Sequence, residues 1–114
     1  MRRVLILLPL LVAGGCLSPE SYAQKQAKLA CQWTEECAKA LFEATYSSMS
    51  DCIATEADRE EDQNSTCEFD AEQGNECLSA ARKYNGECSP NPAELEEIAR
   101  ECSNVYYSCG ALND

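Results

Sequence analysis

The chain has 114 residues, with 20 acidic and 9 basic side chains, a formal net charge of −11 and no histidine. This length suits a single domain, and so acidic a chain offers no basic face for binding nucleic acid. The lack of histidine removes the commonest general base and metal ligand. Nine cysteines indicate folding in an oxidising compartment. We therefore expect no catalytic residues and no cofactor.

The N-terminal segment has the pattern of an export signal. Two arginines precede the short apolar run Val4–Val12, and the small residues Ala13–Gly15 precede Cys16. The run is too short to span a bilayer, which takes about 20 apolar residues, and the whole pattern is typical of a signal peptide. Over Val12–Cys16 it resembles the lipobox of bacterial lipoproteins. That resemblance implies cleavage before Cys16 and attachment of acyl chains such as palmitate to Cys16.

An ordinary signal peptidase is the alternative, because Ala13 and Gly15 also satisfy its small-x-small rule. Cysteine parity favours lipidation: without Cys16, eight cysteines remain, enough for four disulfides. We predict a signal peptide over residues 1–15 and a cysteine-rich domain over residues 16–114. The predicted disulfide cysteines are Cys31, Cys37, Cys52, Cys67, Cys77, Cys88, Cys102 and Cys109.

Helical spacing of apolar residues recurs through the mature chain, and no segment alternates with a period of two. The predicted helices cover residues 19–46, 50–57, 70–84 and 91–109, and over residues 58–66 we expect the end of the second helix to fray into an exposed loop. Ser18, Ser50, Asp70 and Asn91 are the expected N-caps. Glu94 stands three residues after Asn91, which predicts a capping box. We expect an all-α fold of four helices in two hairpins, linked by about four disulfides.

Hairpin geometry favours particular disulfide pairs, because residues equidistant from an antiparallel turn face each other. A turn near residue 89 pairs Cys77 with Cys102, and a turn near residue 49 pairs Cys31 with Cys67. Cys31 and Cys37 lie on one predicted helix more than a turn apart, so we expect no bond between them.

The spacings of the cysteines and of the acidic residues do not match those of known metal sites. The chain has no Cys-x2-Cys pair of the kind that structural zinc sites use. Asp58, Glu60 and Asp62 alternate like calcium ligands, yet Gln63 and Phe69 stand where an EF-hand needs glycine and glutamate. A weak, nonspecific calcium site is the most that this loop predicts, and we assign no metal ligand.

The cysteine-containing segments resemble those of a group of bacterial lipoproteins. The lipobox-like start, Cys67–Asp70, Cys77–Ala80 and Cys102–Tyr106 resemble small cysteine-rich lipoproteins of myxobacteria and related bacteria. Leu17 after the cysteine resembles an outer-membrane sorting signal. The resemblance implies a lipid-anchored cell-envelope protein, in a group largely without assigned function.

Two aromatic residues, Trp33 and Tyr107, fall outside the predicted helical stripes and are candidates for a surface that binds a protein partner. We expect a binding or structural module held at the membrane by its N-terminal lipid. The alternative is a freely secreted, disulfide-rich inhibitor or effector. Membrane fractionation distinguishes the two.

Overall fold

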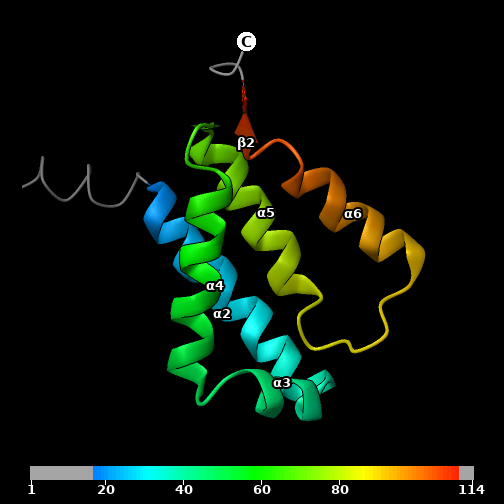
Figure 1. Ribbon diagram of the computed structural model, residues 1–114. Coiled ribbons are helices and arrows are strands. Elements are labelled where there is room, and N and C mark those ends of the chain that lie inside the picture. Colours follow the sequence, from blue (N-terminus) through cyan, green and yellow to red (C-terminus); the bar gives the residue numbers. More distant parts are fainter. Residues whose placement is uncertain (1–16, 111–114) are drawn as a thin grey trace, which may run out of the picture.

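The computed structural model describes residues 17–110 (Figure 1), so the predicted signal peptide and Cys16 lie outside the described residues. The elements in chain order are α2 (Pro19–Cys37), α3 (Lys39–Thr45), α4 (Met49–Gln63), β1 (Glu68–Phe69), α5 (Ala71–Lys83), α6 (Pro92–Cys102) and β2 (Tyr106–Tyr107). None of the helices within 17–110 is long and apolar enough to cross a membrane.

The two expected hairpins are present. Helix α4 runs back along α2, and α6 runs back along α5 (Figure 1), with α2 also in contact with α5. The N-caps form as predicted at three helices: the side chains of Ser18, Asp70 and Asn91 each accept a backbone N–H of the first turn. The capping box of Asn91 and Glu94 is complete. The mostly helical class is confirmed, but the described chain has five helices where four were predicted.

The additional helix arises because the first predicted helix is interrupted. Ala38 has φ −142° and ψ 55°, so the chain turns there and α3 begins. This turn lets Phe42 pack on the buried Cys31–Cys52 disulfide. No glycine or proline marks the interruption, and the physical reason lies in this tertiary packing.

The second predicted helix is longer than expected. Helix α4 starts after Ser48, which caps it by accepting the N–H of Asp51, and it continues to Gln63. The segment 58–66, predicted as a helix end that frays into a loop, therefore stays helical as far as Gln63. Its glutamate, arginine and glutamine residues are good helix formers, and Arg59 pairs with Glu56 one turn before it.

The all-α prediction is wrong in one detail, because two strands of two residues each form an antiparallel pair. Phe69 faces Tyr106, and Glu68 faces Tyr107. The helix predicted over 91–109 ends at Cys102 instead. Aromatic residues favour extended backbone, and strands this short carry no period-two signal.

Four disulfides join the eight cysteines of the described chain. Cys77–Cys102 is confirmed, as is the absence of a bond between Cys31 and Cys37. The predicted Cys31–Cys67 bond is wrong, because α3 occupies the connection between α2 and α4 and so displaces the centre of the turn. The remaining bonds are Cys31–Cys52, Cys37–Cys88 and Cys67–Cys109.

The buried core consists of small clusters rather than one large body. The cluster at the strand end contains Leu17, Tyr22, Cys77, Leu78 and Val105. Leu17 is only 8% exposed, although it is the first described residue. A Cβ atom at Gly74 would lie 3.0 Å from Leu17 Cδ2 and 3.3 Å from ring atoms of Phe69 and Tyr22. Glycine at this position thus lets Leu17 pack against α5.

We therefore expect Gly74→Val to lower the free energy of unfolding by about 2 kcal/mol, because the branched side chain forces Leu17 and its neighbours apart. Gly86→Val is the matched control, since nothing lies within 4 Å of a Cβ atom at that position. Thermal unfolding followed by circular dichroism measures both variants. Equal midpoints for the two would contradict the packing of Leu17 on α5.

Candidate functional site

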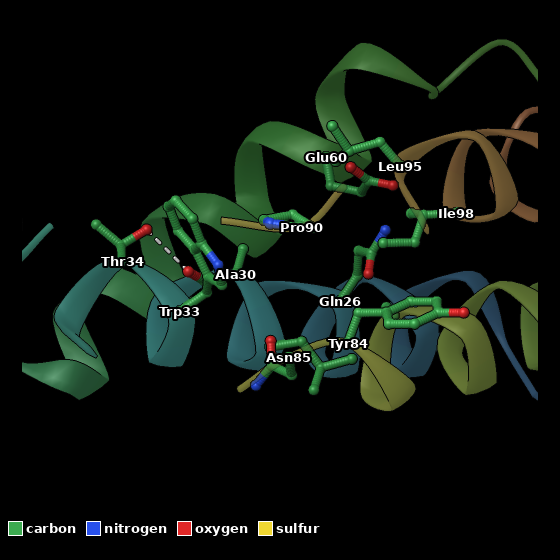
Figure 2. A pocket seen from close by; sticks show the side chains of 12 residues that line it. Gln26, Ala30, Trp33, Thr34, Glu60, Tyr84, Asn85, Pro90, Leu95 and Ile98 are labelled. Carbon is green, nitrogen blue, oxygen red and sulfur yellow. Dashed lines mark hydrogen bonds between the residues drawn. The ribbon is translucent and has the colours of Figure 1, made fainter. Parts of the chain in front are cut away.

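A groove of about 470 Å³ runs between α2 and the α5–α6 hairpin. Figure 2 shows side chains of α2, α4, α5 and α6 turned towards the same space. Its lining residues are Gln26, Leu29, Ala30, Trp33, Thr34, Glu60, Ala81, Tyr84, Asn85, Pro90, Leu95 and Ile98. Most of these side chains are apolar, and Leu95 remains 52% exposed. The groove is thus an open apolar surface of the kind that binds partners.

One end of the groove is closed by the loop between α5 and α6. The indole Nε1–H of Trp33 donates to the backbone carbonyl of Glu87 at 2.8 Å. One turn further along α2, Cys37 is bonded to Cys88 in the same loop. The hydrogen bond and the disulfide together fix this loop to the C-terminal half of α2.

The far wall of the groove is α6, which polar contacts hold against α5. Tyr84 donates its hydroxyl to Glu97 at 2.7 Å, and Lys83 lies 3.3 Å from the same carboxylate. The hydroxyl of Tyr84 and the ammonium of Lys83 both lower the pKa of Glu97. Gln73 donates to the backbone carbonyl of Glu101 at 2.6 Å. These bonds orient α6 so that Leu95 and Ile98 face the groove.

Glu60 is the one acidic side chain that lines the groove. It projects from α4 towards the space in front of Leu95 (Figure 2). Within residues 17–110, no cation or hydrogen-bond donor pairs with its carboxylate. Burial raises the pKa of Glu60 above its ordinary value of 4.5, with no neighbouring charge to offset the shift. The groove therefore contains an unpaired, half-buried negative charge.

Two tyrosines that do not line the groove are also affected by this charge. Burial, followed by the charge of Glu60, raises the pKa of Tyr22 and raises that of Tyr106 to about 12. The Tyr22 hydroxyl lies 3.2 Å from Cys77 Sγ, and Gln26 donates to that hydroxyl at 3.4 Å. The buried hydroxyl of Tyr106 has no partner within the described chain. Both phenols stay protonated near neutral pH and serve as packing groups here.

The two aromatic residues proposed from the sequence lie at different places. Trp33 is half-buried at the edge of the groove. Tyr107 is 45% exposed on β2, at the end of the molecule opposite α3 (Figure 1), and does not line the groove. The two residues therefore lie on separate parts of the surface, and a partner role for either stays a prediction. Cys16, the predicted lipidation site, lies outside the described residues.

The acidic residues that suggested calcium do not converge. Asp58, Glu60 and Asp62 all lie on α4, where residues two apart point to different faces of the helix. Across residues 17–110 no group of three or more cysteine or carboxylate side chains is placed to hold a metal ion.

Sequence reasoning did not predict that Glu60 lines a groove or that α6 is exposed. Ile53, Ala57 and Glu60 follow helical spacing once α4 extends to Gln63, so a carboxylate on the apolar face was the available signal. The helical spacing of Leu95 and Ile98 is typical of residues that face a core. The structure leaves Leu95 exposed and Ile98 half-buried.

Comparison of the chain with protein families, curated proteins and solved structures found no match.

Because the pKa of Glu60 is raised in the folded state, the effect of this residue on the free energy of unfolding should depend on pH. Below about pH 4.5 the carboxyl group is neutral in both the folded and the unfolded chain, and above its raised pKa the folded state bears the cost of the buried charge. Glu60→Gln should therefore stabilise the protein at pH 7, by no more than about 1 kcal/mol because the group is half exposed. That gain should vanish at about pH 4.

Urea unfolding of the wild type and Glu60→Gln at both pH values measures this difference. A variant that is less stable than the wild type at pH 7 would show that Glu60 has a stabilising partner.

Proposed function

We propose that this protein is a lipid-anchored cell-envelope protein whose disulfide-linked helical domain is a binding module. In this proposal residues 1–15 are a lipoprotein signal peptide, Cys16 carries the lipid and residues 16–114 form the domain. Leu17 directly after Cys16, which resembles an outer-membrane sorting signal, supports an outer-membrane location. We propose a role without catalysis, because within the described residues Glu60 is the only carboxylate that lines the groove, with no second one to share a proton-transfer reaction.

The observation that carries the binding role is the groove between α2 and α6. Trp33, Leu95 and Ile98 present apolar surface there, although the protein buries few large side chains elsewhere. A small domain gains stability by covering such surface. An apolar groove that stays exposed and contains the charge of Glu60 does not help the chain to fold. Binding of a partner explains this groove better.

The position of Leu17 supports the anchored arrangement. Leu17 is buried against α5 and α2 begins at Pro19, so a lipid on Cys16 would be attached one residue from the core. With so short a connection, the domain would lie at the membrane surface and face its partners in a restricted orientation. The four disulfides support an oxidising compartment.

The anchor is tested by the intact mass of the protein from its own host, alkylated without prior reduction. We expect a chain that starts at Cys16, that is, 114 − 15 = 99 residues, with added acyl chains and no alkylated thiol. An unlipidated chain with one alkylated cysteine would favour the alternative, a freely secreted inhibitor or effector.

The binding role is tested by photo-crosslinking in the same host. A benzoylphenylalanine in place of Leu95, inside the groove, should give a discrete crosslinked species on ultraviolet irradiation. The matched control is the same replacement at Leu41, which is 60% exposed on α3 and outside the groove. Identical patterns from the two positions, or none from Leu95, would contradict a partner in the groove.

A further inference from the structure

We propose that the groove binds a polypeptide segment carrying a lysine or arginine among apolar residues, with the cationic side chain paired to Glu60. This inference rests on the proposed binding role and adds the chemistry of the partner.

The cations of the domain leave Glu60 unpaired. The chain has nine basic residues, of which Arg2 and Arg3 belong to the predicted signal peptide, so 9 − 2 = 7 remain. Four of these pair with other acids: Lys39 with Glu43, Arg59 with Glu56, Lys83 with Glu97 and Arg100 with Glu101. The other three, Lys25, Lys28 and Arg82, line an adjoining depression that shares Leu29 with the groove, and none of them lines the groove itself. The charge in the groove is thus available to a cation from another molecule.

Arg59 is the clearest example of a cation that does not pair with Glu60, because it is adjacent to Glu60 in the sequence. Its guanidinium lies 3.1 Å from Glu56, one turn back along α4, and neither residue lines the groove. If Glu60 served only to form an ion pair within the fold, the guanidinium of its neighbour Arg59 would be the nearest cation in the sequence. That guanidinium pairs with Glu56. Glu60 instead points into a space bounded by Gln26, Leu95 and Ile98 (Figure 2).

The surroundings of the carboxylate favour a polypeptide over a small amine. Pockets for small ligands enclose most of the ligand, whereas here Leu95 on the rim is 52% exposed. Apolar surface continues from Ile98 and Leu29 to Trp33 at the closed end. Such a groove suits several side chains that project from a backbone lying outside it, as in the binding of an amphipathic helix.

Long-range charge supports the same partner. The predicted mature chain carries 7 basic and 20 acidic side chains, a net charge of 7 − 20 = −13. A field of this sign attracts cationic segments and increases their association rate. An ion pair in a half-buried groove is also screened less by salt than one on the surface.

The test uses an alanine-rich peptide of about 15 residues, with one lysine flanked by leucines at i−4 and i+3. A second peptide carries acetyl-lysine at the same place, which keeps the shape and removes the charge. The protein has a single tryptophan, Trp33, at the edge of the groove, so its fluorescence reports binding without a label. Calorimetry provides an independent dissociation constant.

We expect the lysine peptide to bind at least about tenfold more tightly than the acetyl-lysine peptide. Glu60→Gln should abolish that difference, and its urea unfolding curve at pH 7 checks that the variant is folded. Glu61→Gln is the matched control: it removes the same charge from the next residue, which lines a different depression beside Tyr106. It should leave the tenfold preference intact.

Equal affinity for the two peptides, or an equal effect of both glutamine variants, would overturn the pairing with Glu60. Crosslinking through Leu95 would still stand as evidence for a partner of other chemistry. Binding of octylammonium chloride without binding of the lysine peptide at about 1 mM would overturn the assignment to a polypeptide. Failure of both probes would overturn the proposed chemistry altogether.

Discussion

Helix α6 is held in place by covalent bonds and polar contacts rather than by burial, and the groove depends on this. None of its eleven residues, all within the described chain, is buried. The Cys77–Cys102 disulfide fixes its C-terminal end to α5, and Cys37–Cys88 fixes the loop before it to α2. A helix anchored only by apolar contacts would have to bury Leu95 and Ile98 to stay in position. Because the disulfides supply the attachment, these side chains remain accessible.

The use of disulfides in place of apolar burial also explains how so small a core can stabilise the fold. The buried residues form three clusters, two of which include a disulfide, Cys31–Cys52 or Cys77–Cys102. The third contains only alanines with a half-buried isoleucine beside them. Each disulfide contributes about 2–4 kcal/mol by restricting the unfolded chain, compared with about 5–15 kcal/mol for the whole stability of a typical domain. Apolar surface can then be left in the groove without loss of the fold.

Local chemistry made part of this structure predictable from the sequence. The caps at Ser18, Asp70 and Asn91 depend on neighbouring residues only, and Cys77–Cys102 follows from the register of a simple hairpin. Cys31–Cys52 required knowledge of α3, which exists because Phe42 packs on that disulfide. The pairing of β1 with β2 joins segments far apart in the chain, and no local pattern encodes it. Glu60 could be recognised as a groove residue only once α4 was known to reach Gln63.

The disulfide pairing divides the described chain into two halves. Cys31–Cys52 lies wholly in the first half, while Cys67–Cys109 and Cys77–Cys102 lie wholly in the second. Cys37–Cys88 alone crosses between them. A protease cut just after α4 would therefore leave two fragments joined by this one bond. The groove lies between these halves, so Cys37–Cys88 is the one disulfide of the described chain that ties its two walls together.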